Sequence, residues 1–382
     1  MKKTKAKLNV GTVISYAGAY VATVIGSGFA TGQELLQFFG YFGYGGLIAA
    51  AIAVIMFAWV GATIITRGQA MKMNEDGKIY QVFCGKVLGT FFEWFGPLFL
   101  FGVFIVMISG AGTTLTEYYG LNAYAGRVLM AFISFVAVSM GLDKLSKILG
   151  AMGPIIIVFT LVVGGISLFH HIGDLGASVE FLKTVTVNKP APNAWVSGVI
   201  YTSFNVILVI TFLTALGKSS DNPRNCFWGG IVGAVALMAA ATMMYLAILS
   251  SMPNVYNKGI PSLFLANEIH PFIGVVFSII LLMGIFTTAA PLLWTVTARV
   301  VPDNSPKFKV VCLVVTVAGL IGGFLPFEVL VNTLYPYTGY MGILILVCAL
   351  VRQITGKWGY MNEPYQAYEN GITPAQRAKR RV

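Results

Sequence analysis

The stretch Ala22-Thr23-Val24-Ile25-Gly26-Ser27-Gly28-Phe29-Ala30-Thr31-Gly32-Gln33-Glu34 decides how this chain is organised. It lies inside an apolar run from Val10 to Phe39. A continuous helix over that run would be about 45 Å long, whereas the hydrocarbon core of a bilayer is roughly 30 Å thick. The glycines within the stretch have weak helix propensity and a freely turning backbone. We therefore predict that the helix breaks near Gly26–Gly32 and continues as a short second helix to Phe39.

Composition places this run in an integral membrane protein. Hydrophobic residues make up 57% of the chain and charged residues only 10%, a balance typical of polytopic membrane proteins rather than of soluble domains. The long apolar segments predict an all-α fold, because a helix satisfies its own backbone polar groups in lipid. We expect ten transmembrane helices, over residues 10–39, 45–66, 88–116, 123–140, 146–169, 194–217, 226–251, 271–298, 308–325 and 328–351.

The distribution of lysine and arginine predicts the orientation of these helices. With the N-terminus in the cytoplasm, the outer loops contain only four of the 25 basic residues, namely Arg127, Lys183, Lys189 and Lys258. Cytoplasmic loops are enriched in basic residues, so both termini are predicted to be cytoplasmic. The formal net charge of +11 is then explained by attraction to anionic membrane lipids. It implies no nucleic-acid partner.

The longest polar outer stretch divides the ten helices into two groups of five. An odd number of helices in each group places the two halves in opposite orientations, as in an inverted repeat. The second half opens with a run of small and polar residues, Trp195–Asn205, so helix 6 is predicted to be broken like helix 1. The expected organisation is a cytoplasmic tail (1–9), a first five-helix repeat (10–169), an extracellular connection (170–193), a second repeat (194–352) and a cytoplasmic tail (353–382).

Broken helices at mid-membrane depth expose backbone amides and carbonyls that a cargo can satisfy. Exposed amides at a half-helix N-terminus suit a carboxylate, and freed carbonyls suit an ammonium. This favours a zwitterion such as an amino acid, or a small amine. The aromatic residues Phe29, Tyr201 and Phe204 could act as gates, and the alternative is that they serve only in packing. The candidate substrate-binding residues on the two broken helices are Thr23, Gly26, Ser27, Gly28, Tyr201, Thr202, Phe204 and Asn205.

These features carry a family resemblance. Ten helices in two halves, the break at Gly26-Ser27-Gly28 and the pair Thr287-Thr288 on helix 8 resemble the LeuT-type fold of the amino acid–polyamine–organocation superfamily. The string from Gly26 to Glu34 closely resembles the YkvI-like group of bacterial membrane proteins. The fold-level resemblance covers residues 10–352, whereas the group-level motif is short. The resemblance implies secondary transport by alternating access in the bacterial inner membrane, with helices 1, 2, 6 and 7 moving against helices 3, 4, 8 and 9.

The resemblance also implies a sodium site between helices 1 and 8. Carried over position by position, its ligands are the carbonyl oxygens of Ala22, Ile25 and Gly284 and the hydroxyls of Thr287 and Thr288. A hard cation such as Na⁺ prefers several oxygen ligands, and a broken helix frees carbonyls to provide them. The alternative is that both threonines donate to carbonyls of their own helix, as Ser and Thr often do in membranes.

Glu34 is an intramembrane carboxylate about one turn beyond the break. Such a group is costly to bury in its charged form and often serves in coupling or gating, as a proton carrier, a cation contact or a gate. The alternative is a carboxylate capped by the amides of its own outer helix. Proton-coupled relatives can place a lysine of helix 5 at the sodium position, but the matching segment Gly153–Ile155 has no basic residue. Coupling to Na⁺ is therefore preferred to coupling to protons.

Other classes of function are disfavoured. The sequence has no phosphate-binding glycine loop with its lysine and no Ser-His-Asp order, so we expect no enzyme. His170, His171 and His270 are predicted on outer loops without a ligand cluster at metal-binding spacing. We expect no covalent cofactor and no obligate protein partner, only membrane lipids and a small-molecule substrate. The sequence thus predicts a Na⁺-coupled symporter of an amino acid or amine. The alternatives are a proton-coupled carrier using Glu34 and a non-transporting ligand sensor of the germinant-receptor kind.

Overall fold

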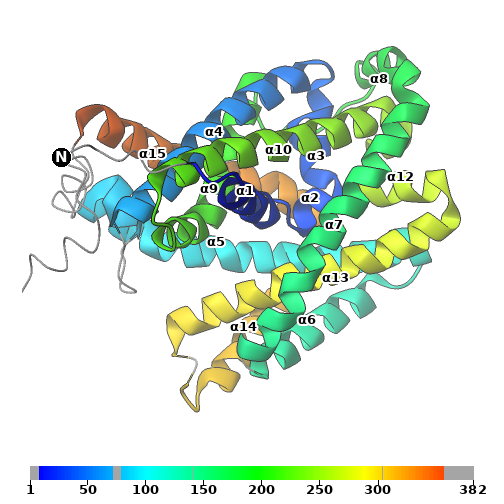
Figure 1. Ribbon diagram of the computed structural model, residues 1–382. Helices are drawn as coiled ribbons and strands as arrows, with labels where there is room; N and C mark the ends of the chain where they lie inside the picture. Colours follow the sequence, from blue (N-terminus) through cyan, green and yellow to red (C-terminus); the bar gives the residue numbers. More distant parts are fainter. Residues whose placement is uncertain (1–7, 72–78, 141, 303, 357–382) are drawn as a thin grey trace, which may run out of the picture.

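The computed structural model describes residues 8–71, 79–140, 142–302 and 304–356, with the side chains of residue 27 and of residues 142–154 left out of that description (Figure 1). Every regular element within these ranges is a helix, and they contain no strand. The predicted all-α class is therefore confirmed. Most of the two predicted cytoplasmic tails lies outside the described residues.

Within the described ranges, ten helices are apolar and at least 15 residues long. Seven segments are long and apolar enough to cross a membrane: α4 (Gly45–Met71), α5 (Ile79–Tyr119), the stretch Ile155–Leu182 that begins within α7 (Leu142–His171), α9 (Ala194–Lys218), α10 (Pro223–Ser250), α13 (Pro271–Val300) and α15 (Phe327–Thr355). The other three are α1 (Val10–Val24), α6 (Ala123–Ser139) and α14 (Phe308–Gly322). Each predicted span overlaps one of these helices, which supports a multi-pass membrane protein. The division into two inverted repeats stays a prediction.

Shorter helices connect the long ones. They are α2 (Ser27–Thr31), α3 (Gln33–Phe38), η1 (Gly40–Phe42), η2 (Ile172–Asp174), α8 (Leu175–Leu182), α11 (Met252–Val255) and α12 (Pro261–Ile269).

The first span is broken, as the sequence predicts. At the end of α1 the Gly26 N–H donates to the carbonyl of Val24 at 2.8 Å, and not to that of Ala22 four residues back. The chain then forms α2 and α3, which are separated by Gly32 in a left-handed conformation with φ of +77°. A residue with a Cβ would be strained there by roughly 1–2 kcal/mol. The glycines of the stretch therefore divide one span into three short helices.

The prediction that helix 6 is also broken is wrong. α9 is continuous, because its polar residues donate to carbonyls one turn earlier: Thr202 Oγ1 to Gly198 O at 3.1 Å and Ser203 Oγ to Val199 O at 2.6 Å. These bonds satisfy the hydroxyls without opening the helix. Gly198 serves close packing instead, since a Cβ on it would overlap the carbonyl oxygen of Ala49 in α4.

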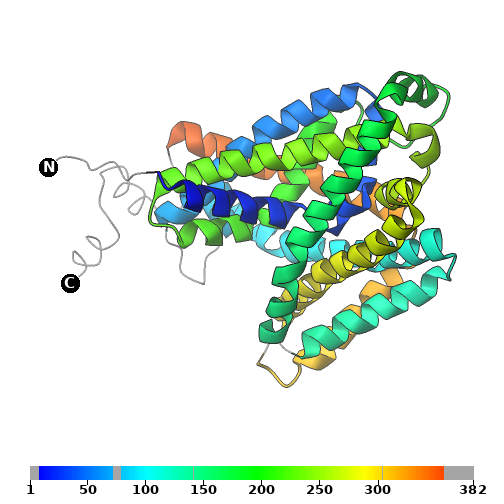
Figure 2. The ribbon, with the colours of Figure 1, turned by 45° about the vertical axis from the view of Figure 1, so that its right-hand side comes forward.

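The long helices pack in two groups. One group consists of α1, α4, α9 and α10, and the other of α5, α6, α13 and α14. α7 crosses between them and contacts α10 and α13, while α15 packs on α9 and α5 (Figures 1 and 2). The start of α1 and the end of α15 lie at the same end of the molecule (Figure 2). We call this the terminal end and the opposite one the distal end.

The contact between α4 and α9 is made by glycines on both helices. A Cβ on Gly68 of α4 would overlap the carbonyl oxygen of Thr214, and a Cβ on Gly217 of α9 would overlap that of Ile65. Small residues of this kind let membrane helices approach until their backbones touch. The two helices are therefore packed at backbone distance near the terminal end, in addition to the contact of Gly198 near the distal end.

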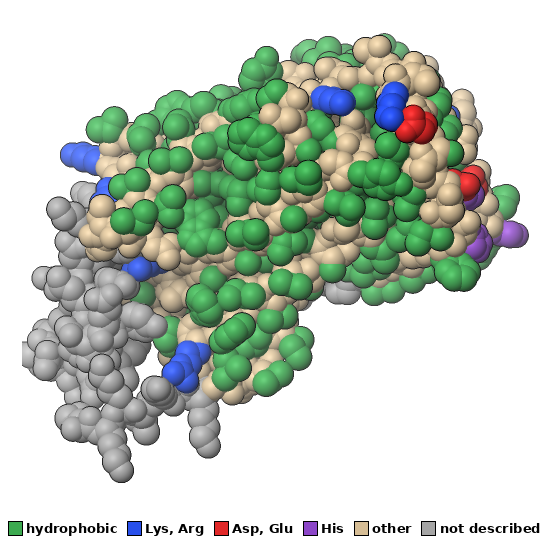
Figure 3. All heavy atoms as spheres, turned by 90° about the horizontal axis from the view of Figure 1, so that it is seen from above, with side chains coloured by type: hydrophobic (Ala, Val, Ile, Leu, Met, Phe, Trp, Pro, Cys, Tyr) green, Lys and Arg blue, Asp and Glu red, His purple; other side chains and the backbone are tan. Residues whose placement is uncertain are grey.

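The outer surface is apolar, as expected for a protein embedded in lipid. Hydrophobic side chains cover most of the face seen in Figure 3, with few charged side chains among them. Exposed hydrophobic residues occur on both helix groups, for example Ile55 and Val232 on the first and Leu98, Phe132 and Val314 on the second.

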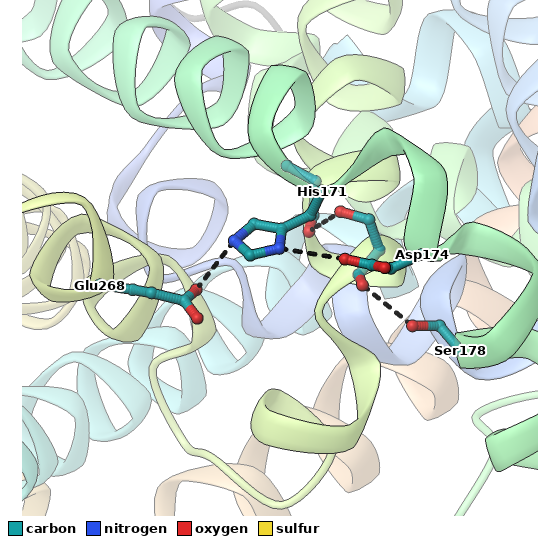
Figure 4. A network of polar contacts seen from close by, with 6 residues as sticks. His171, Asp174, Ser178 and Glu268 are labelled. Carbon is teal, nitrogen blue, oxygen red and sulfur yellow. Dashed lines mark hydrogen bonds and ion pairs between the residues drawn. The ribbon is translucent and has the colours of Figure 1, made fainter.

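The histidines predicted on outer loops make local contacts at the distal end. The His171 ring lies between two carboxylates, with Nδ1 3.2 Å from Asp174 Oδ2 and Nε2 3.7 Å from Glu268 Oε2 (Figure 4). His270 Nδ1 accepts from the Phe272 N–H at 3.1 Å and caps α13. Among the residues that the structure describes, no cluster of His, Cys, Asp and Glu could hold a metal ion.

Candidate functional site

A cavity of about 890 Å³ lies between the two helix groups. Its walls come from the break between α1 and α2, from α9, and from α5 and α13 of the second group, with Tyr335 of α15 contributing one side chain. Cavities that bind small molecules have volumes of about 300–1,000 Å³. The space at the helix break is therefore large enough for an organic solute.

In the part of the chain that the structure describes, the cavity extends toward one end of the molecule. From Glu34 at the break, its lining follows α13 as far as Arg299 and α9 as far as Ala215, which takes it toward the terminal end. Arg299 is exposed, so the lining includes solvent-accessible residues there. On the distal side of the break every residue of α3 is buried. The conformation is thus open toward the terminal end and closed toward the distal end.

Glu34 is the charged residue at the closed end of the cavity. Its side chain is only 7% exposed and lines the cavity. The carboxyl group lies against Gly28, where a Cβ would overlap Glu34 Oε1 and come within 2.9 Å of its Cδ. Tyr201 and Tyr335 are within electrostatic range of this carboxylate. Glu34 is thus a buried residue that the structure places directly against the helix break.

The residues predicted on helix 1 are brought to the cavity. Thr23, Gly26 and Gly28 line it, as does Phe29. The predicted contribution of the Ser27 side chain lies outside the part of the chain that the structure describes. These positions converge because the break turns the end of α1 and the start of α2 toward the same space.

The predicted contribution of helix 6 needs correction. Of its four candidates, Asn205 lines the cavity, whereas Tyr201, Thr202 and Phe204 are fully buried and do not. The Phe204 ring stacks on Tyr335, with centroids 4.8 Å apart and an interplanar angle of 16°. Because α9 is continuous, only one face of it reaches the cavity. Its other residues form an aromatic layer behind the site.

The residues predicted to bind sodium also meet at this cavity, which is lined by Ala22, Ile25, Gly284, Thr287 and Thr288. A Cβ on Gly26 would lie 3.7 Å from Thr288 Oγ1, so the break packs directly against α13. Both threonine hydroxyls donate to the carbonyl of Gly284, at 2.9 and 3.1 Å, as the alternative interpretation expected. Such a hydrogen bond uses the hydrogen alone and leaves the oxygen lone pairs as acceptors.

Sequence reasoning missed the mouth of the cavity at the terminal end. There Arg299 Nη2 donates to the carbonyl of Glu93 at 3.2 Å, and its guanidinium group lies 4.8 Å from the ring centroid of Trp94. Glu93 Oε1 in turn accepts from the Tyr80 N–H at 3.2 Å. Glu93 could have indicated this mouth, because it is a carboxylate within the predicted apolar span 88–116, just as Glu34 is a carboxylate within the first span.

The distal end is closed by the loop between α11 and α12. The Glu117 carboxylate of α5 accepts the N–H groups of Gly259 at 2.7 Å and Ile260 at 3.1 Å. With its amide nitrogen facing this loop, Gln33 of α3 donates to the carbonyls of Lys258 and Gly259 at 3.0 and 3.2 Å. One loop is thereby bonded to α5 and to α3, and we call it the distal seal (residues 256–260).

A tyrosine outside the spans completes the distal seal. Tyr41 in η1 donates through its hydroxyl to the carbonyl of Tyr256 at 2.9 Å. Burial, with a smaller contribution from the Glu328 carboxylate, raises the pKa of Tyr41 to about 12. Its hydroxyl therefore stays protonated at neutral pH and remains a donor.

Replacing Glu117 by glutamine should loosen the distal seal. A carboxamide has one acceptor oxygen in place of two, and its NH₂ group cannot accept the second N–H. Hydrogen bonds to a charged group contribute about 1.5–3 kcal/mol each, so we expect a lower melting temperature and faster amide hydrogen exchange over residues 256–263. Glu180→Gln is the matched control, because Glu180 is exposed and pairs with Lys183 on the surface. Unchanged exchange in Glu117→Gln would show that these bonds do not hold the seal.

Comparisons with known proteins agree with this architecture. No family model matches the chain. It is 24% identical over 349 residues to the uncharacterized membrane protein YkvI of Bacillus subtilis (strain 168), covering 90% of this chain and 96% of that protein. It is 22% identical over 342 residues to the uncharacterized protein YyaD of the same organism, covering 88% and 96%. The resemblance to YkvI is therefore not confined to the short motif.

Solved structures with a similar fold are those of transporters. MhsT in complex with L-phenylalanine matches with a TM-score of 0.60 at 13% identity, covering 98% of this chain and 94% of that one. Mhp1, a nucleobase-cation-symport-1 family transporter, in a closed conformation with bromovinylhydantoin bound, matches with a TM-score of 0.59 at 13% identity, covering 94% and 96%. The chain therefore has the fold of LeuT-like transporters over nearly its whole length.

Proposed function

We propose that this protein is a secondary active transporter of a small organic solute, an amino acid or an amine, that works by alternating access. It would act in the inner membrane of a bacterium with both termini in the cytoplasm, as the distribution of basic residues predicts. The observation that carries the proposal is the cavity of about 890 Å³ at the break of helix 1, open toward one end and closed at the other. A protein with one such central site, rather than a continuous pore, is suited to moving solute in two steps.

Coupling to Na⁺ is part of the proposal. Three facts support it: the five residues expected to bind sodium line one cavity, the Ala22 carbonyl loses its usual helical donor because the Gly26 N–H turns to Val24, and both threonine hydroxyls keep acceptor lone pairs. Oxygen ligands of this kind fit a hard monovalent cation. In our proposal α1, α4, α9 and α10 move against α5, α6, α13 and α14.

Transport in proteoliposomes with an imposed Na⁺ gradient tests this function. We expect uptake of the solute when NaCl is outside, and loss of that uptake when KCl of equal ionic strength replaces it. Removing the hydroxyl in Thr288→Ala should weaken the dependence on Na⁺ at least tenfold. Thr297→Ala is the matched control, since Thr297 lies on the same helix and donates to Leu293 at 2.7 Å without lining the cavity.

The same experiment separates the alternatives. Uptake that follows a proton gradient and is unaffected by Thr288→Ala would replace Na⁺ coupling by proton coupling through Glu34. Binding of solutes without any flux would contradict transport and support a ligand sensor.

A further inference from the structure

The charged residues that line the cavity differ between its closed end and its mouth. Among its described lining residues, the charged ones are Glu34 at the closed end and Glu93 and Arg299 at the mouth. The guanidinium group of Arg299 is held at the mouth by Trp94 and by the backbone of Glu93. A solute at the helix break therefore meets one carboxylate and, among the described residues there, no basic side chain.

The space next to the break is unsuited to a second carboxylate. The carboxyl group of Glu34 already fills the volume beside Gly28, close enough that even a methyl group there would overlap it. A carboxylate on the solute would have to lie beside this buried carboxyl group in a poorly solvated site, where the two groups cannot both be charged without strong repulsion. A zwitterionic amino acid is therefore disfavoured at this position, whereas an ammonium group is attracted to it.

The same cavity is lined by a hydrogen-bond acceptor and by apolar surface. Asn205 lines the cavity and donates its amide nitrogen to the carbonyl of Tyr201 at 2.9 Å, which leaves its amide oxygen as an acceptor. The nearby walls include Phe29, Val103 and Met107. Such walls provide few of the several oxygen ligands that a bare divalent ion needs, but they suit the hydrocarbon body of an organic cation, with aromatic rings attracting its charge.

We propose that the transported solute is an organic monocation, an amine without a carboxylate, whose ammonium group pairs with Glu34 while its apolar body occupies the cavity toward α5. This inference rests on the proposed function and narrows its substrate class. Glu34 would then be the specificity-determining residue of the site.

Four probes with one phenyl ring separate the charge classes: 2-phenylethylamine (cation), 2-phenylethanol (neutral), L-phenylalanine (zwitterion) and 3-phenylpropionate (anion). A ligand that binds the folded state raises its thermal stability by mass action, so melting of the purified full-length protein is measured with each probe and with a parallel aliphatic set. We expect stabilisation by the amines alone, with an affinity at least tenfold above that for the matched alcohols. This comparison uses the unmodified protein and needs no variant.

Glu34→Gln should then lower amine affinity at least tenfold, and Glu34→Asp should lower it less because the charge is kept. Glu268→Gln is the matched control, since Glu268 lies at the distal surface beside His171 (Figure 4). Stabilisation by the zwitterions or acids, no stabilisation by any amine, or an unchanged amine affinity in Glu34→Gln would overturn the inference. If the amino acid or the acid is taken up in the flux assay, the transport function holds and only the preference for amines is rejected. If no probe is taken up, both the transport function and the preference for amines are rejected.

Discussion

Replacing Gly28 by alanine should abolish solute binding while leaving most of the protein folded. The added methyl group would overlap Glu34 Oε1 and come within 2.9 Å of Cδ. The carboxyl group is the end of a flexible side chain and can move, so the main consequence is displacement of Glu34 from the break and not loss of the fold. We expect at least a tenfold loss of binding and uptake with a fall in melting temperature of only a few degrees.

Two comparisons make the Gly28 result specific. Gly18→Ala adds the same methyl group to α1 at a position with no atom within 4 Å, and it should leave binding unchanged. In a double variant with Glu34→Gln, Gly28→Ala should add little further loss, because both changes act on one group and coupled effects are not additive. Full additivity of the two losses would show that Gly28 acts independently of Glu34.

Replacing Gly217 by alanine should destabilise the whole protein. A Cβ there would overlap the Ile65 carbonyl oxygen and lie 2.9 Å from the Gln69 backbone nitrogen. Backbone atoms cannot rotate away as a side chain does, so α4 and α9 must separate. Overpacking of this kind costs about 1–3 kcal/mol, and we expect a lower melting temperature and a lower yield of folded protein in a fixed detergent.

The control for Gly217 is Gly165→Ala in α7, where a Cβ would meet only the Met243 sulfur at 3.8 Å. Gly165→Ala should have the same melting temperature as the unmodified protein. Gly68→Ala should lower the melting temperature as Gly217→Ala does. The double variant should lose less stability than the sum of the two single losses, because one separation of α4 from α9 relieves both overlaps. Melting of Gly217→Ala at the unmodified temperature would mean that these helices are not in backbone contact.

The break in the first span could be predicted because its causes are local. The run from Val10 to Phe39 is too long for one straight helix, and Gly26 and Gly32 offer the places where the backbone can turn. The same residue types do not break α9, since Gly198 there packs against the backbone of Ala49 in α4. Whether a glycine breaks a helix or admits a neighbour depends on its packing partner, which a single sequence does not specify.

The site could be predicted in part for the same reason. Residues at the break reach the cavity because the break itself forms one wall. The opposite walls depend on which faces of α5, α13 and α15 turn inward, and these faces have no local signature. Tyr335 and Arg299 were therefore missed, whereas Glu34 was found because a carboxylate in an apolar span is conspicuous on its own.

The backbone contact between α4 and α9 has a mechanical consequence. Helices that touch through Gly68 and Gly217 have no layer of side chains between them to absorb sliding or rotation. We therefore expect α4 and α9 to move together as one stiff unit, so that a displacement at one end is passed on to the other. A shift of this pair at the distal end would then move the part of the cavity wall that α9 forms, from Asn205 to Ala215.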